Sequence, residues 1–331
     1  MIFMDKALKY EDVCLIPNYS QCGSRSECST LTKFGPQEFK LPIVPSNMKS
    51  VICPSVAEWM SENNYFYIMH RFDIDILAFL VSSNEDNWRT ISISVGVNEK
   101  DRDLLIKAAS LKLRIDYITI DIAHGHSANM SRMIEHVKRS FPDAYLIAGN
   151  VATAQGVTAL SDWGADAVKV GIGQGSPCTT KDKTGFTMPM FSCVWDCSGL
   201  PKERGFALGD EPSKNIPIIA DGGIKCNGDI AKALVARADM VMAGGLFASC
   251  TDSPAESIKV NGNTYKAYFG SASAQNKGHN NHTEGTLINI NSSGITYEDK
   301  LKEIKQDLQS SISYAGGRDL ACFKNVAYHL A

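Results

Sequence analysis

Short runs of apolar and β-branched residues recur along the chain from residue 41 and alternate with segments that can form helices. The runs are LPIVPSN (41–47), YFYIMH (65–70), ISISVGV (91–97), YITIDIAHGHS (117–127), YLIAGNVA (145–152), AVKVGIG (167–173), PIIADGG (217–223) and MVMAGG (240–245). The helical segments are 56–63, 102–111, 131–140, 153–163 and 229–236. Strands that alternate with helices indicate βαβ units and a parallel sheet. Nearly continuous apolar strands agree with this, because both faces of a parallel sheet are buried.

The number of repeats decides between two parallel architectures. A doubly wound dinucleotide-binding sheet carries GxGxxG after its first strand, whereas the first run here ends in Pro45-Ser46-Asn47. Eight strand-like runs in one chain instead predict a closed α/β (β/α)8 TIM barrel. No linker is visible, so residues 1–331 are predicted to form a single catalytic domain.

Three segments lie outside the repeat. YEDVCLIP (10–17) is expected to form a short strand or lid. The stretch 265–290 is rich in Gly, Ser, Asn and His and lacks apolar periodicity, which predicts a mobile active-site flap. Residues 297–314 place Leu301, Ile304, Leu308 and Ile312 on one face and precede Gly316-Gly317, as expected of a C-terminal helix.

Composition narrows the possible partners. The formal net charge is -3 with a pI near 6.2, so there is no overall basic field for nucleic acid or a membrane surface. The N-terminus is too polar for a signal peptide, and no apolar run has membrane-spanning length. The ten cysteines are scattered and lack metal-binding spacing, which is typical of a cytoplasmic protein with free thiols.

Polar and glycine residues follow the predicted strands. Barrel enzymes build their active sites at the carboxyl ends of the strands, although each such residue alone could be a cap or turn former. The residues at these ends are Ser46, Asn47, His70, Arg71, Asp121, His124, Asn150, Asp221, Gly244 and Gly245.

The loop 171–185, GIGQGSPCTTKDKTG, follows the sixth run. Cys178 lies in this loop near Thr180 and two lysines, Lys181 and Lys183. Lysines and loop amides favour the thiolate, which is the nucleophilic form of cysteine. Cys178 is therefore a candidate nucleophile. The alternative is that one cysteine of ten falls in a loop by chance.

The loops after the seventh and eighth runs, ADGGI (220–224) and MAGG (242–245), occupy the positions where barrels commonly bind phosphate. Asp221 would repel a phosphate directly, so we expect it to accept hydrogen bonds from ribose hydroxyls. The combination predicts a nucleoside 5′-monophosphate. Two tight turns and a helix cap are the alternative.

The flap adds further candidates. YFGSAS (268–273) offers Tyr268, Gly270 and Ser271 as phosphate donors. Glu284 is the only carboxylate between Glu256 and Glu298, which makes it the candidate acid or base of the flap.

Together the cysteine loop, ADGGI, MAGG and YFGSAS resemble the IMP dehydrogenase and GMP reductase family, and the resemblance runs from YEDVCLIP to SISYAGG. Within the family the chain is similar to the bacterial-type GMP reductase branch. There is no room after His70 for the regulatory CBS insertion of the dehydrogenases, and no Arg-Tyr pair occurs within 265–290. KDKTGF, AHGHS and TEG are like the reductases.

The resemblance implies an oxidoreductase of purine nucleotide salvage that converts GMP and NADPH to IMP, ammonia and NADP⁺. Cys178 would add to purine C2 and form a thioimidate intermediate, while Thr180 and Glu284 would deliver the proton to the leaving ammonia. Covalent chemistry with general-acid help is a common strategy. The family also implies a homotetramer.

The resemblance assigns three groups of binding residues. The nucleotide group is Ser176, Asp221, Gly222, Gly223, Gly244, Gly245, Tyr268, Gly270 and Ser271. The NADPH group is Ser24, Arg25, Arg71, Asp121, Ile122 and Ala123. The carbonyls of Gly173, Gly175 and Cys178 resemble a potassium site, near which the chain departs from the family pattern at Gln174, Pro177 and Lys181.

Three other functions stay open at this point: an IMP dehydrogenase without its regulatory domain, a flavin-dependent barrel enzyme and a catalytically silent nucleotide-binding barrel.

Overall fold

The computed structural model describes residues 6–199, 216–278 and 281–331. Its strands are β1 (Val13–Leu15), β2 (Thr32–Phe34), β3 (Gln37–Phe39), β4 (Ile43–Pro45), β5 (Ser92–Val95), β6 (Tyr117–Asp121), β7 (Tyr145–Val151), β8 (Ala167–Val170), β9 (Ile218–Asp221), β10 (Met240–Ala243), β11 (Ser257–Val260), β12 (Asn263–Phe269), β13 (Leu287–Asn291) and β14 (Tyr328–Leu330).

The α-helices are α1 (Pro54–Glu62), α2 (Ile76–Glu85), α3 (Glu99–Ser110), α4 (Ala128–Ser140), α5 (Ala154–Asp162), α6 (Thr180–Thr184), α7 (Met190–Cys197), α8 (Asn227–Val235), α9 (Gly245–Ala248), α10 (Ala274–Lys277) and α11 (Tyr297–Tyr314). The 3₁₀ helices of the described residues are η1 (Tyr10–Asp12), η2 (Arg25–Glu27) and η3 (Leu320–Asn325), which lie near the two ends of the chain.

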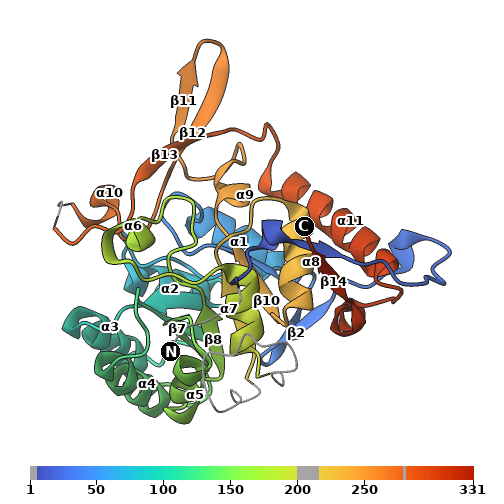
Figure 1. Cartoon of the computed structure of the whole chain (residues 1–331). Helices are drawn as coiled ribbons and strands as arrows, with labels where there is room; N and C mark the ends of the chain where they lie inside the picture. Colours follow the sequence, from blue (N-terminus) through green and yellow to red (C-terminus); the bar gives the residue numbers. More distant parts are fainter. Residues whose placement is uncertain (1–5, 200–215, 279–280) are drawn as a thin grey trace.

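A curled parallel sheet of seven strands forms the centre of the molecule, in the order β4-β10-β9-β8-β7-β6-β5. The neighbouring strands are parallel throughout, and helices such as α3, α4 and α5 cover the outside of the sheet (Figure 1). The predicted α/β barrel class is confirmed by this arrangement. No helix among the described residues combines the length and apolar character needed to cross a bilayer.

The prediction of a regular strand at 65–70 is wrong. Its backbone pairing with β5 is a single parallel bridge between Met69 and Ile93. The Met69 amide donates to the Ser92 carbonyl at 3.1 Å, and the Ser94 amide donates to the Met69 carbonyl at 2.9 Å. Phe66 and Ile68 are fully buried in the cluster that fills the sheet interior. The segment is therefore held at the edge of the curled sheet by the packing of these side chains. The backbone hydrogen-bond ladder of a regular strand is not formed there.

One end of the curled sheet is closed by the β2–β3 hairpin. Phe34 and Phe39 from this hairpin pack against Phe66 and Tyr117, with ring centroids 5.0 to 6.4 Å apart among the four rings. The Tyr117 hydroxyl donates to the Phe34 carbonyl at 2.7 Å. Because Tyr117 begins β6, the hairpin and its aromatic rings cover the amino end of the strands. The carboxyl end stays available for a site.

The predicted helices are present with small shifts at their ends, as α1, α3, α4, α5 and α8. The C-terminal helix is confirmed as α11, with Leu301, Ile304, Leu308 and Ile312 buried. Thr296 caps its start by accepting a hydrogen bond from the Asp299 amide. Near the N-terminus, YEDVCLIP forms η1 and β1, and β1 pairs with β14 at the other end of the chain.

The flap region is more regular than its sequence predicts. β12 pairs with β11 on one side and β13 on the other, and β11 and β12 project from the body of the molecule (Figure 1). The polar composition obscures a period of two in the strand β13, in which the half-buried Ile288 and Ile290 alternate with exposed neighbours. Residues 279 and 280 lie outside the described residues, and the mobility of the flap stays a prediction.

Candidate active site

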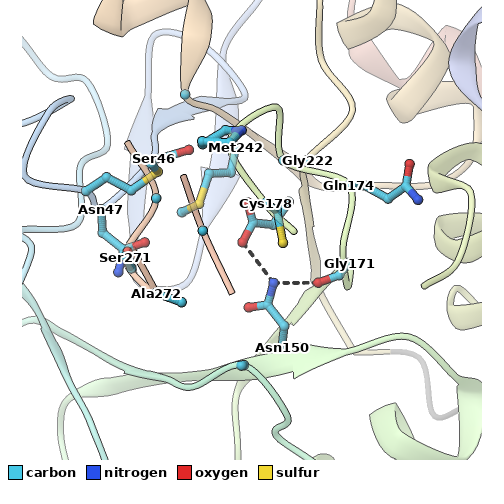
Figure 2. A pocket seen from close by; sticks show the side chains of 18 of the residues that line it. Ser46, Asn47, Asn150, Gly171, Gln174, Cys178, Gly222, Met242, Ser271 and Ala272 are labelled. Carbon is cyan, nitrogen blue, oxygen red and sulfur yellow. Dashed lines mark hydrogen bonds between the residues drawn. The ribbon is translucent and has the colours of Figure 1, made fainter. Parts of the chain in front are cut away.

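A cavity of about 550 Å³ opens at the carboxyl end of the parallel strands. Its wall combines the strand ends, the cysteine loop and parts of the flap, as Figure 2 shows for Asn47, Asn150, Cys178 and Ser271. Most residues assigned from the sequence line this one cavity. They are Arg71, Asp121, Ile122, Ala123, Gly173, Gly175, Ser176, Cys178, Thr180, Asp221, Gly222, Gly223, Gly244, Gly245, Tyr268, Gly270, Ser271 and Glu284.

The cysteine loop leaves β8 at a position that only glycine can occupy. Gly171 has φ 137°, and a Cβ there would lie 2.1 Å from the Asp221 carbonyl oxygen. This close approach packs the loop against the end of β9. The loop then brings Cys178 to the cavity wall, where the Cys178 amide donates to the Gly175 carbonyl at 3.0 Å.

The three candidate catalytic side chains form a continuous hydrogen-bonded chain. The Cys178 thiol donates to Thr180 Oγ1 at 3.1 Å, and the Thr180 hydroxyl donates to Glu284 Oε2 at 2.7 Å. Thr180 begins α6, whereas Glu284 comes from the flap. A proton can therefore pass between the sulfur and the carboxylate through one hydroxyl.

Backbone pairing fixes the flap against the cysteine loop. The Thr179 amide donates to the Glu284 carbonyl at 2.9 Å, and the Thr286 amide donates to the Pro177 carbonyl at 2.8 Å. Between them Cys178 and Gly285 form an antiparallel bridge. The Glu284 amide in turn donates to the Ala272 carbonyl at 3.0 Å, so main-chain hydrogen bonds hold the residue that carries the carboxylate.

The glycine turns after β9 and β10 form another part of the wall. A Cβ on Gly244 would lie 2.0 Å from the Tyr268 Oη atom, so glycine is needed for the tyrosine to reach this turn. Tyr268 is 4% exposed, and burial raises its pKa, so its hydroxyl keeps the proton at neutral pH. Tyr268 can therefore donate a hydrogen bond to a phosphate beside these turns.

A buried ionic network lies at the floor of the cavity. Lys169 Nζ is 2.8 Å from Asp121 Oδ1 and 2.5 Å from Asp221 Oδ2. Asn47 Nδ2 donates to Asp121 Oδ2 at 2.9 Å, and Asn150 Nδ2 donates to Asp221 Oδ2 at the same distance. Burial disfavours the charge on Lys169, but the two carboxylates outweigh it and raise the lysine pKa. Lys169 is not among the residues predicted from the sequence, where its one signal is a lone lysine inside the apolar strand AVKV.

Asp121 carries a charge for the same reason. Burial opposes its ionisation, but Lys169 and the Asn47 amide outweigh burial and lower the pKa of this carboxyl. The network therefore holds one cation between two anionic groups, one at the end of β6 and the other at the end of β9.

The cavity extends from the cysteine toward Arg71, whose guanidinium lies 4.7 Å from the centre of the Phe72 ring. The Arg71 Nε atom is buried and has no hydrogen-bond partner among the described residues. A buried donor without a partner is costly, so this atom fits a ligand that brings an acceptor. Ile122 and Ala123 complete this side of the cavity.

Ser24 and Arg25 lie away from the cavity. Arg25 is exposed at η2, where its guanidinium lies 5.3 Å from the centre of the Tyr314 ring and donates to the Ser310 hydroxyl at 3.3 Å. The structure therefore does not bring these two residues to the other candidates within one chain, and their role stays a prediction.

The proposed potassium ligands share one loop. Carbonyl oxygens suit a hard cation. The Gly175 carbonyl already accepts the Cys178 amide, which occupies one of its two lone pairs. Gln174, which departs from the family pattern, donates from Nε2 to Thr187 Oγ1 at 2.6 Å. This bond ties the loop to the segment after α6, and cation binding stays a prediction.

A family model described as the IMP dehydrogenase / GMP reductase domain matches residues 7–330. The chain belongs to this family. Among curated members of the IMP dehydrogenase / GMP reductase family it is similar to the GMP reductases of Staphylococcus aureus strains JH9, N315 and Newman. Each is 47% identical over 325 residues, which cover 98% of this chain and 96% of the relative. The family resemblance predicted from the motifs is confirmed.

Proposed function

We propose that this protein is a GMP reductase, which converts GMP, NADPH and a proton to IMP, ammonia and NADP⁺. The observation that carries the proposal is the hydrogen-bonded chain from Cys178 through Thr180 to Glu284, which joins a nucleophile to a carboxylate on the flap. The identity of 47% with curated GMP reductases over almost the whole chain supports it.

The hydrogen-bonded series Cys178, Thr180 and Glu284 can carry the proton transfers of the first half of the reaction. The Cys178 proton moves through Thr180 to Glu284, and the thiolate adds to purine C2 of GMP. Glu284 then returns a proton through Thr180 to the amino nitrogen, the C2–N bond breaks, and ammonia leaves. The product is a thioimidate between Cys178 and C2. Proton transfer by positioned side chains typically contributes about 10²–10⁴-fold to the rate.

The second half restores the cysteine. NADPH supplies, when bound, the hydride that C2 requires. As C2 is reduced, the C2–S bond breaks, its electron pair returns to sulfur and IMP is released. Arg71, Ile122 and Ala123 are proposed to hold the dinucleotide beside C2, and the unpartnered Arg71 Nε gives the site a donor for it.

The nucleotide is proposed to lie along the opposite wall. Asp221 would accept from the ribose hydroxyls, and Tyr268 would donate to the phosphate. The remaining phosphate contacts are proposed for Ser176, Gly222, Gly223, Gly244, Gly245, Gly270 and Ser271, all of which line the cavity. This arrangement would place the purine over the cysteine loop.

The assembly and the outer part of the cofactor site follow from the resemblance. We propose a cytoplasmic homotetramer, in keeping with ten free cysteines. Because Ser24 and Arg25 lie outside the cavity, they would contact NADPH only where it extends beyond the cavity or where another copy of the chain approaches. The bound potassium ion at Gly173, Gly175 and Cys178 is a proposal of the same kind.

Absorbance at the nicotinamide band tests the proposed activity. The purified protein should oxidise NADPH only when GMP is present, with one ammonia and one IMP formed per NADPH. Reaction of IMP with NAD⁺ and no reaction of GMP would assign the protein to the dehydrogenases instead. A yellow protein that reduces a bound flavin would also contradict the proposal.

A further inference from the structure

Lys169 occupies an unusual place for a lysine. It lies in β8 at the centre of the parallel sheet, and its side chain is 3% exposed. In the strand register Asp121 is opposite Gly149, and Gly149 is opposite Lys169. A Cβ on Gly149 would lie 2.6 Å from Lys169 Cβ. The missing side chain at Gly149 therefore leaves room for Lys169 to reach across β7 to Asp121.

The same ammonium group reaches the next strand on the other side. Lys169 is opposite Ile219 of β9, and Asp221 lies two residues further on, on the same face of that strand. The length of the lysine side chain spans this offset, since Nζ lies 2.5 Å from Asp221 Oδ2. One cation thus joins a carboxylate of β6 to a carboxylate of β9.

The two carboxylates differ in how many of their oxygen atoms already contact the protein. Asp121 uses Oδ1 for Lys169 and Oδ2 for Asn47. Asp221 directs only Oδ2 to the protein, where Lys169 and Asn150 both meet it. Asp221 Oδ1 accepts no hydrogen bond from the part of the chain that the structure describes. Asp221 lines the cavity, so this second oxygen is available to a ligand.

We propose that Lys169 is a positioning residue for the nucleotide. It balances the charge of Asp221 and fixes Asp221 Oδ2, which leaves Asp221 Oδ1 to accept hydrogen bonds from the ribose hydroxyls. Asp121 is the counter-charge that holds Lys169 in place. This inference rests on the proposed function, because it takes GMP as the ligand. It assigns Asp121 to the support of the substrate site.

The physical argument concerns the charge left behind when the lysine is removed. Without the ammonium group, two partly buried carboxylates share one network and have no cation between them. Breaking a buried ion pair by deleting one partner is strongly unfavourable, and like charges drive one group to bind a proton or to turn away. Either response disturbs the acceptor for ribose. Neutralising Asp121 as well removes the excess charge.

Three variants separate charge balance from packing: Lys169→Met, Asp121→Asn, and the double variant with both changes. Lys169→Met should raise the KM for GMP by about 30–100-fold with a smaller change in kcat, the pattern of lost ground-state binding. Asp121→Asn alone should change this KM by less than about threefold, because the Lys169–Asp221 pair remains. The double variant should recover at least about tenfold of the loss in KM.

A substrate analogue shows whether the effect passes through the ribose. Deoxy-GMP without the 2′- or the 3′-hydroxyl lacks one of the groups proposed to donate a hydrogen bond to Asp221. For at least one of these analogues the penalty of Lys169→Met should be smaller than for GMP, because the two changes remove the same interaction. A purely structural role of Lys169 gives equal penalties for GMP and both analogues, and equal penalties would overturn the proposal.

Lys300→Met is the matched control. Lys300 is 8% exposed and pairs with Glu303 in α11, outside the cavity. This variant should lose stability without any change in the KM for GMP. If Lys169→Met does not fold, the double variant carries the test: its KM for GMP should stay within about tenfold of wild type, and a rise above about 100-fold contradicts charge balance.

The wild-type protein distinguishes failure of this inference from failure of the proposed function. Wild type that does not oxidise NADPH with GMP contradicts the proposed function itself. Wild type that does so, together with a Lys169→Met variant whose KM for GMP is unchanged, overturns only the role of Lys169.

Discussion

The Thr180 hydroxyl donates a 2.7 Å hydrogen bond to Glu284 Oε2, and 104 residues of sequence separate the two. Thr180 lies two residues after the candidate nucleophile, and Glu284 is carried by the flap. The backbone of 284–286 pairs with the cysteine loop and holds the glutamate beside Thr180. The predicted opening of the flap would remove the carboxylate from the site, so we expect closure and proton delivery to be coupled.

Removing either member of this pair should slow chemistry more than binding. Thr180→Val keeps the shape of the side chain but deletes the hydroxyl relay, and Glu284→Gln deletes the base. We expect kcat to fall by about 10²–10⁴-fold in each variant. Because both break one relay, the double variant should fall little further than the worse single variant. Steady-state kinetics and equilibrium binding of GMP check this, and fully additive losses in kcat would contradict a shared relay.

Gly244→Ala should disturb the nucleotide site through Tyr268. The added methyl group would lie 2.0 Å from Tyr268 Oη, so the tyrosine must move away from the turn. Overpacking of this kind typically costs about 1–3 kcal/mol of stability. We also expect a higher KM for GMP, measured by steady-state kinetics beside urea unfolding.

Gly228→Ala is the control for this substitution. Gly228 lies in α8, and the nearest atom to an added Cβ is Cys226 Sγ at 3.9 Å. Alanine favours a helix over glycine by up to about 1 kcal/mol. The control should be as stable as wild type or more so, with normal kinetics. Equal behaviour of the two variants would show that the Gly244–Tyr268 contact has no consequence.

Acid should destabilise the fold through His70. Burial, with a smaller contribution from Lys49, lowers the pKa of His70 from 6.5 to about 4. Between these two pH values the unfolded chain binds a proton that the folded chain does not, so stability falls as the pH drops from 6.5 toward 4. The full difference is about 3 kcal/mol.

His70→Asn should remove this part of the pH dependence. The Asn Oδ1 atom can replace His70 Nδ1 as acceptor for the Phe72 amide, which donates at 3.2 Å in the native chain. Urea unfolding at pH 7, 5.5 and 4.5 should therefore give a shallower pH slope for the variant. An unchanged slope would assign the acid sensitivity to other groups.

Much of the fold could be predicted because the period of the apolar residues is local information. The alternation of strand and helix gave the parallel sheet, and the glycine and polar residues after each strand indicated its functional edge. The segment 65–70 has the composition of a strand but is held by Phe66 and Ile68, and side-chain packing of this kind is not visible in a periodic pattern. The regular β12–β13 pairing was hidden by polar residues for a similar reason.

The residues of the candidate site that belong to sequence motifs could be predicted. The residue that balances the charge of the site could not. Cys178, Thr180 and Glu284 follow from sequence motifs, and the structure brings them into contact. Lys169 could not be recognised because its role depends on the register of the strands. Only the pairing of Gly149 with both Asp121 and Lys169 shows that the lysine side chain reaches across β7 to Asp121. Ser24 and Arg25 carry motif similarity, but they lie outside the cavity, where Arg25 contacts α11, and the motif does not reveal this.

The proposed mechanism requires a covalent bond between Cys178 and the substrate, and Cys178→Ala removes the sulfur that would form it. GMP-dependent NADPH oxidation and GMP binding are measured on the variant and on wild type. We predict that turnover disappears while the affinity for GMP stays within about threefold of wild type, because most of the proposed contacts to the nucleotide are at the ribose and phosphate. A Cys178→Ala protein that reduces GMP at the wild-type rate would contradict the covalent mechanism.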